Sequence, residues 1–184
     1  LGQFGEYGTK KGQLNFPRGI AISQSGTVYV ANSLNHRIEI FGLDGVYIGS
    51  FGSEGSLPNQ FEFPEDLSIS SKGNVFVTDS SNHAVKVFSE IGGFLYQFGT
   101  QGSGNTQFNF PKGITLSPID SIYVADTGNY RFSKFSVSGT QLTTFGTQGV
   151  TDGKFDSAQD AAVAVNGNVY VADGGNRRIQ IFSA

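Results

Sequence analysis

The sequence predicts an all-β protein, a β-propeller of four four-stranded antiparallel blades. The main observation is a repeat of 47 residues that runs through the 184-residue chain without insertion or deletion. The second is composition: 26 glycines and only 15% charged residues are typical of many short strands joined by tight turns. The repeat is visible in equivalent positions such as Phe41, Phe88, Phe135 and Phe182.

The second unit illustrates the four strands that we expect in each blade. Residues 66–70, 74–79, 84–88 and 94–99 alternate and are rich in β-branched or aromatic side chains, with Ser, Gly and Asn between them. A longer loop, 100–111, leads to the next unit. We therefore expect one propeller domain, 1–184, with repeat units at about 17–52, 64–99, 111–146, and 158–184 plus 1–5.

Phenylalanine marks the expected core between the blades. Of the 17 phenylalanines, 15 fall in five columns of the repeat, those of Phe4, Leu14, Phe16, Tyr29 and Phe41. Blades that stack around an axis are covered on both faces, so both faces should be apolar. The aromatic columns are therefore expected to be structural.

The two ends of the chain belong to one blade of the repeat. The last unit stops after its third strand, and the first five residues align with the fourth strands of the other units. The expectation is an N-terminal strand that completes the last blade. Donation within one chain would close a ring, whereas donation to a neighbouring chain would give a larger ring or a filament. The residues of this closure strand are Leu1, Gly2, Gln3, Phe4 and Gly5.

Composition excludes several classes of partner. The net charge of −3, with lysine and arginine spread along the chain, argues against nucleic acid. No apolar run is long enough to insert into a membrane. The absence of cysteine rules out disulfides and thiolate chemistry. Because the chain does not begin with methionine, we expect a processed product, a fragment or part of something longer.

The repeated motif resembles that of NHL-repeat proteins over the whole chain. It appears as "PRGIAISQSGTVYVANSLNHRIEIF" at 17–41, as "PKGITLSPIDSIYVADTGNYRFSKF" at 111–135 and as "GNVYVADGGNRRIQIF" at 167–182. The resemblance implies a β-propeller, most often six-bladed, similar to proteins that bind other proteins, RNA or ligands, and to a minority of metal-dependent lyases and hydrolases. This sequence departs from that pattern in having four units. The histidines of the lyase-like members do not map onto His36 or His83.

Polar residues recur in the turn between the second and third strands. A side chain at the end of the second strand can accept hydrogen bonds from the N–H groups of the following turn, and the asparagine three residues later suits a positive φ. Since one set occurs in every blade, we expect a structural turn; His36 and His83, in two of these turns, are poor metal ligands. The residues are Asn32, Asp79, Asp126 and Asp173, and Asn35, Asn82, Asn129 and Asn176.

One column near the expected axis alternates between glycine and acid. Gly19, Asp66, Gly113 and Asp160 follow each other around the blades, and Glu65 adds a further acid. Two facing aspartates could hold a hard cation such as Ca²⁺ or share a proton. The simpler interpretation, which we favour, is that they hydrogen-bond backbone groups where a strand begins. No cofactor is expected, with calcium on the axis as the alternative.

These features favour a non-enzymatic interaction or structural scaffold. No nucleophile beside a base and no phosphate-binding loop is evident. The expected partners are other proteins or copies of the chain, bound by strand donation or by the long loops 5–17, 52–64, 99–111 and 146–158. The alternative is a propeller enzyme, or a cation-dependent binder, centred on Asp66 and Asp160. The resemblance favours an extracellular or cell-surface location.

Overall fold

Residues 2–183 are described by a computed structural model, in which fifteen β-strands form four antiparallel sheets. Each sheet is one blade, and its strands follow chain order. Blade 1 contains β1 (Pro17–Ile22), β2 (Val28–Asn32), β3 (Arg37–Phe41) and β4 (Tyr47–Phe51); blade 2 contains β5 (Pro64–Ile69), β6 (Val75–Asp79), β7 (Ala84–Phe88) and β8 (Phe94–Phe98); blade 3 contains β9 (Ile114–Leu116), β10 (Ile122–Asp126), β11 (Arg131–Phe135) and β12 (Gln141–Phe145); blade 4 contains β13 (Ala158–Val163), β14 (Val169–Asp173) and β15 (Arg178–Phe182).

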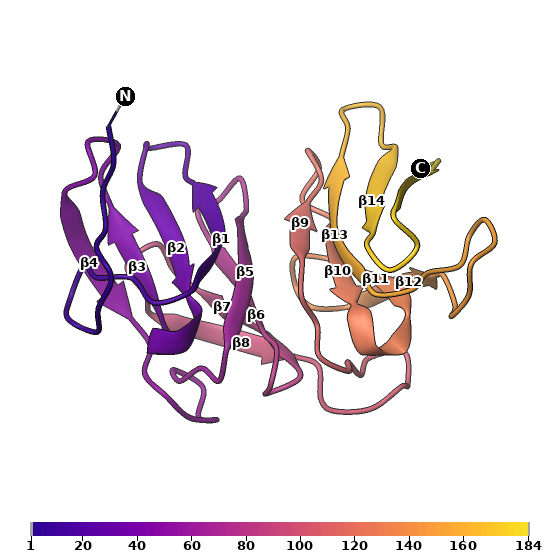
Figure 1. Ribbon diagram of the computed structural model, residues 1–184, viewed down its shortest axis with the longest axis horizontal. Helices are drawn as coiled ribbons and strands as arrows, with labels where there is room; N and C mark the ends of the chain where they lie inside the picture. The colour runs from indigo at the N-terminus through magenta and orange to yellow at the C-terminus, as the bar shows by residue number, and fades with distance from the viewer. Residues whose placement is uncertain (1, 184) are drawn as a thin grey trace.

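The four blades lie side by side around a common axis, from blade 1 at the N-terminal end to blade 4 at the C-terminal end (Figure 1). The innermost strands β1, β5, β9 and β13 contact one another in this order, and residues at or just before all four line one central cavity. The predicted all-β propeller of four blades is therefore confirmed. The turns after β2 and β10 are single 3-10 turns, Ser33–Asn35 and Thr127–Asn129.

The buried hydrophobic residues within 2–183 form four clusters, three of which each lie between two neighbouring blades. In the first, Tyr29 and Ile38 of blade 1 pack against Phe61, Leu67 and Phe88 of blade 2. Equivalent columns build the clusters between blades 2 and 3 and between blades 3 and 4. We call the side of a blade that faces the preceding blade its leading face and the other its trailing face. The predicted role as inter-blade core is confirmed for the columns of Phe4, Leu14, Tyr29 and Phe41. It is wrong for the column of Phe16, because Phe16 is 64% exposed and its equivalent Phe110 is 49% exposed.

The innermost strands begin with a local irregularity. The pairing of β5 with β6 shifts register between Pro64 and Asp66, and β13 shifts in the same way between Ala158 and Asp160. A bulge of this kind bends a strand and redirects its side chains. It occurs at the column that alternates between glycine and aspartate, so Asp66 and Asp160 reach the axis from bulged strand entries.

Within one chain the N-terminal segment does not complete the last blade, whereas donation to a neighbouring chain, the other predicted form of closure, stays a prediction. Blade 4 has three strands, and no strand is formed by residues 2–5; Leu1 lies outside the described residues. Phe4 instead packs on Phe41 of blade 1, with 4.9 Å between ring centroids. Because the N-terminus lies over blade 1 and the C-terminus over blade 4, at opposite ends of the array (Figure 1), the segment does not reach β15.

Within residues 2–183 the structure contains no helix with the length and apolar character needed to cross a membrane.

Candidate functional site

The predicted turn residues anchor the long loop that enters each blade. In blade 2, Asp79 accepts a hydrogen bond from the N–H of Glu62, in the loop before β5, with 2.7 Å between the atoms. Asn82 donates its amide to the carbonyl oxygen of Gly55, farther back in the same loop, and to Asp79. The carboxylate therefore binds the preceding loop. The prediction that it accepts hydrogen bonds from the backbone of the following turn is wrong. The same pair of anchors recurs in the other blades at Asn32 and Asn35, Asp126 and Asn129, and Asp173 and Asn176.

The positive φ that we expected at these asparagines lies one residue later. His36 has a φ of 51° and His83 a φ of 52°, and Tyr130 and Arg177 are alike. The asparagines are used instead for their side-chain amides. The His83 ring packs on Phe110 of the next blade, and its Nδ1 accepts a hydrogen bond from the backbone N–H of Phe110. His36 packs on Phe63 in the same way. Both histidines therefore lie at inter-blade contacts.

Each blade pairs a buried carboxylate with one cation, but the residues that supply them change. Blades 3 and 4 use Asp126 with Arg131 and Asp173 with Arg178. In blade 2 alanine replaces the arginine at position 84, and Lys86 pairs with Asp79 at 2.9 Å. In blade 1 asparagine replaces the aspartate, and Glu39 supplies the carboxylate for Arg37. Each cation also donates to carbonyl oxygens of the entering loop, at Thr9 and Lys10, Leu57 and Gln60, Ser103, Gly104 and Gln107, and Thr151 and Lys154.

These cations are not among the residues predicted from the sequence. The signal was present as two linked columns: Arg37, Ala84, Arg131 and Arg178 in one, and Glu39, Lys86, Ser133 and Gln180 in the other. Neither column keeps the same charge in all four blades. Together with the column of Asn32, Asp79, Asp126 and Asp173, however, they supply one acid and one cation in every blade. The anchors hold the base of each loop and leave its tip exposed, for example at Tyr7 and Val150.

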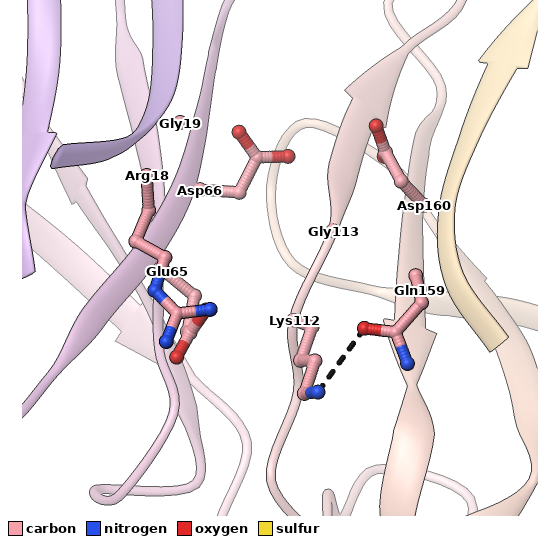
Figure 2. Close-up of a pocket in the computed structure, with 8 residues that line it drawn as sticks. All are labelled: Arg18, Gly19, Glu65, Asp66, Lys112, Gly113, Gln159 and Asp160. Atoms are coloured by element: carbon pink, nitrogen blue, oxygen red, sulfur yellow. Dashed lines mark hydrogen bonds and ion pairs between the residues drawn. The ribbon is translucent and has the colours of Figure 1, made fainter. Parts of the chain in front are cut away.

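The axial cavity has a volume of about 220 Å³ and is lined by all four blades. Figure 2 shows Asp66 and Asp160 on opposite sides, with Glu65 beside Arg18 and Lys112 beside Gln159. Asp66 accepts hydrogen bonds from its neighbour Leu67 and from the N–H of Ile114 in the next blade, at 2.8 and 2.9 Å. Asp160 accepts one from Ala161. These are the backbone bonds that the simpler interpretation predicts.

Glycine alternates with aspartate at the axis because the blades approach closely there. A Cβ atom on Gly19 would lie 2.5 Å from the Cα atom of Asp66, and one on Gly113 would lie 2.7 Å from that of Asp160. Real Cβ atoms do not come so close to backbone, so the main chain at Asp66 and Asp160 leaves no room for a side chain at Gly19 and Gly113.

Burial raises the pKa of Asp66 to about 7. The N–H groups of Ile114 and Leu67 oppose this shift, while the carboxylates of Asp160 and Glu65 add to it because they disfavour a second negative charge. Asp66 can therefore hold a proton near neutral pH. Within residues 2–183, no three or more His, Asp or Glu side chains gather closely enough to hold a metal ion. A cation on the axis would thus depend on two aspartates and backbone carbonyls.

The two ends of the array present apolar side chains that no other blade covers within residues 2–183. On the leading face of blade 1, Ile20 is 60% exposed, whereas its equivalent Leu67 in blade 2 is 3% exposed. On the trailing face of blade 4, Ile179 is 64% exposed, whereas its equivalent Phe132 in blade 3 is fully buried. The exposed faces are therefore two halves of the interface that the chain forms three times internally.

The four sheets around one axis, each entered by an anchored loop, define a β-propeller module. Among the described residues this module has no metal-binding cluster. A sequence model of the NHL repeat matches residues 14–41, 61–88, 108–135 and 155–182, more than half of the chain. The chain belongs to the NHL repeat family.

Relatives with similar sequence share about one repeat with the chain. RING finger protein nhl-1 of Caenorhabditis elegans is 44% identical over 45 residues, which is 24% of this chain and 5% of the relative. B-box type zinc finger protein ncl-1 of the same organism and Protein brain tumor of Drosophila melanogaster are each 42% identical over 43 residues, 23% of this chain and 5% and 4% of the relatives. The matched segment is thus about one twentieth of each of these proteins.

Solved propellers resemble the whole array. A streptogramin B lyase structure superposes with a TM-score of 0.69 at 18% identity, covering 91% of this chain and 54% of that chain. The WD40 β-propeller domain of Doa1 gives a TM-score of 0.69 at 17% identity, covering 93% of this chain and 52% of that chain. At these identities the likeness concerns the fold alone. The four blades correspond to about half of each larger chain.

Proposed function

We propose that this chain is a non-enzymatic protein-interaction scaffold that binds partners through the two end faces of its blade array. The observation that carries the proposal is the exposure of Ile20 and Ile179 in columns that are buried at the internal interfaces. Contiguous apolar surface of this kind on a soluble protein marks an interaction site. Partners that present a β-sheet face fit best, because the faces are built to pack on a sheet.

The outer edge of β15 adds a second binding element. The three complete blades have a fourth strand paired with the third, but β15 has none among the described residues. An unpaired strand edge accepts an extended segment from a partner by main-chain hydrogen bonding. An apolar face beside such an edge therefore favours a partner that supplies a strand together with a packing surface.

The test uses the immobilised chain as bait, in wild-type form and with Ile179→Asp. Proteins retained from the source, copies of the chain included, should be lost with I179D, because a charge on this face is not compensated by the partner. Val165→Asp is the matched control, since Val165 is 93% exposed in the turn between β13 and β14. Hydrogen exchange should show protection of β15 in the complex. Equal retention by I179D, or retention of no protein at all, would overturn the proposal.

The axial cavity supports a second candidate function, the binding of a small ligand or a calcium ion between Asp66 and Asp160. The supporting observation is that charged and polar side chains from all four blades line one cavity. Calcium should then raise the melting temperature of the wild-type protein and leave an Asp66→Asn/Asp160→Asn variant unchanged. An equal response of the two proteins to calcium would reject this candidate.

A further inference from the structure

Blade 1 carries one half of an inter-blade interface. Val28, Val30 and Phe41 form a separate buried cluster on its leading face, with Leu14 and Tyr47 at the edge. The equivalent columns in blade 2 are Val75, Val77 and Phe88, which pack on Tyr29 and Ile38 of blade 1. The leading face of blade 1 therefore has the shape and composition that fit a trailing face.

Blade 4 carries the other half. Its trailing face has a hollow of about 250 Å³, lined by Ala162, Tyr170 and Ile179 among others. The equivalents in blade 1, Ala21, Tyr29 and Ile38, pack against blade 2. In blade 4 the side chains of Tyr170 and Ile179 are exposed instead. This hollow is therefore shaped for the leading face of another blade of the same repeat.

We propose that the partner is a second copy of this chain and that two copies close an eight-bladed ring. The trailing face of blade 4 in each copy packs on the leading face of blade 1 in the other. This proposal rests on the proposed function, since it names the partner of the same end faces. Such a contact is heterologous within one interface, but two of them related by a two-fold axis give a closed dimer.

The N-terminal segment is already placed for this contact. Phe4 lies 4.9 Å from Phe41, and the fourth-strand phenylalanine of each complete blade lies 4.8 Å from its partner in the next blade, as Phe51 does from Phe88. Residues 2–5 therefore occupy, on blade 1, the place of a preceding blade's fourth strand. When blade 4 of the second copy docks there, its β15 meets this segment, and the blade is completed by strand donation.

The axis supplies an independent match. Asp66 of blade 2 accepts a hydrogen bond from the backbone N–H of Ile114, which follows Gly113 in blade 3. Asp160 has the same bond to its own neighbour, but its second carboxylate oxygen has no hydrogen bond from another blade within residues 2–183. In the ring, Asp160 faces Gly19 and the N–H of Ile20 in the second copy, which occupy the columns of Gly113 and Ile114. The alternation of glycine and aspartate then continues unbroken through all eight blades.

The curvature of the array fits closure by two copies. The four blades superpose on about half of a larger propeller. In one such superposition, with a TM-score of 0.69, the aligned part is 91% of this chain and 54% of the neighbour. An array that follows half of a larger ring needs one further array of equal length to close it. Head-to-tail growth should therefore stop at two chains instead of continuing as a filament.

The experiment is sedimentation equilibrium of the wild-type chain over a dilution series. We expect a particle of about 39 kDa, twice the 19.6 kDa of one chain, with no larger species. Ile20→Asp and Ile179→Asp should each reduce the mass to one chain, since each blocks both interfaces of the ring. Both side chains are exposed in the single chain, so the substitutions should leave its folding intact. Val165→Asp should retain the dimer.

Mixing the two variants tests the head-to-tail arrangement. Ile20→Asp keeps an intact blade 4 and Ile179→Asp keeps an intact blade 1, so an equimolar mixture should recover a two-chain particle although neither variant associates alone. A dimer that persists in either single variant would overturn the proposed contact, and filaments would overturn ring closure. A wild-type chain that stays at 19.6 kDa would overturn the second copy as partner. The proposed function would still stand in that case if another protein were retained through Ile179.

Discussion

Lys86 and Asp79 form the ion pair of blade 2, with 2.9 Å between Nζ and the carboxylate oxygen and both side chains buried. Lys86 also donates to two carbonyl oxygens of the entering loop and lies 5.7 Å from the ring centroid of Phe61. Blade 3 achieves the same anchoring with Arg131, two positions earlier in the repeat, and has Ser133 where blade 2 has the lysine. The two arrangements should therefore be interchangeable as complete sets.

Lys86→Ser alone should destabilise the protein by about 3–5 kcal/mol, because it leaves the buried Asp79 without its cation. Ala84→Arg combined with Lys86→Ser installs the residues of blade 3 and should recover most of this loss. Urea unfolding of the two variants measures the difference. If the double variant is no more stable than K86S, then an arginine at position 84 does not stabilise the buried Asp79 as Lys86 does.

Asn32→Asp should destabilise blade 1 by about 1–3 kcal/mol at neutral pH, because Asn32 donates a hydrogen bond to the buried Glu39. The new carboxylate would replace this donor and repel Glu39. Asn32→Asp with Glu39→Gln reproduces blade 4, where Gln180 donates to Asp173, and should be close to the wild type. Thermal unfolding at pH 7 compares the three proteins, and equal losses in the single and double variants would contradict the exchange.

Stability should fall as the pH rises from about 4 to about 7 because of Asp66. Its pKa is about 7 in the folded chain against an ordinary value of 3.8, so the folded state binds more protons than the unfolded state in this range. The loss should be on the order of 2–4 kcal/mol. Asp66→Asn should remove this part of the slope, even if the new amide lowers stability at every pH.

The control for this pH dependence is Asp44→Asn, at an exposed turn position of blade 1. Urea unfolding at several pH values gives the slope of each protein. A wild-type slope that D66N leaves unchanged would show that Asp66 is not the group responsible.

Gly19→Ala should cost about 1–3 kcal/mol, because its Cβ would lie 2.5 Å from the Cα atom of Asp66 and force blades 1 and 2 apart. Gly49→Ala is the matched control, since a Cβ there meets nothing within 4 Å. We expect G49A to be neutral or slightly stabilising in the same unfolding measurement. Equal effects of the two substitutions would mean that the axis tolerates more space between blades.

The strands and the core could be predicted from the sequence because each follows from a local rule applied four times. Alternation identified strands such as β6 and β7, and the column of Phe88 and Phe135 marked the inter-blade core. The axial position of Asp66 and Asp160 followed from their column at the start of the innermost strand. The 47-residue repeat alone was sufficient to predict these features.

Other features depend on interactions that a single column does not reveal. Lys86 replaces an arginine two positions away, so the anchor became visible only when two columns were compared in space. The positive φ moved from Asn35 to His36 because the 3-10 turn includes the asparagine. The path of residues 2–5 depends on the angle between blades, which the alignment of Phe4 with Phe51 does not contain.

The alternation at the axis restricts how such a chain can change its length by duplication. Every duplicated unit brings its own loop anchor, so gaining or losing 47 residues leaves the remaining anchors intact. The axis restricts such changes more, because the backbone at Asp66 and Asp160 leaves no room for a Cβ atom at Gly19 and Gly113 of the preceding blades. Duplicating one unit would set glycine beside glycine or aspartate beside aspartate, whereas duplicating two adjacent units preserves the order. Evolution by unequal crossing-over should therefore favour even numbers of units in this lineage.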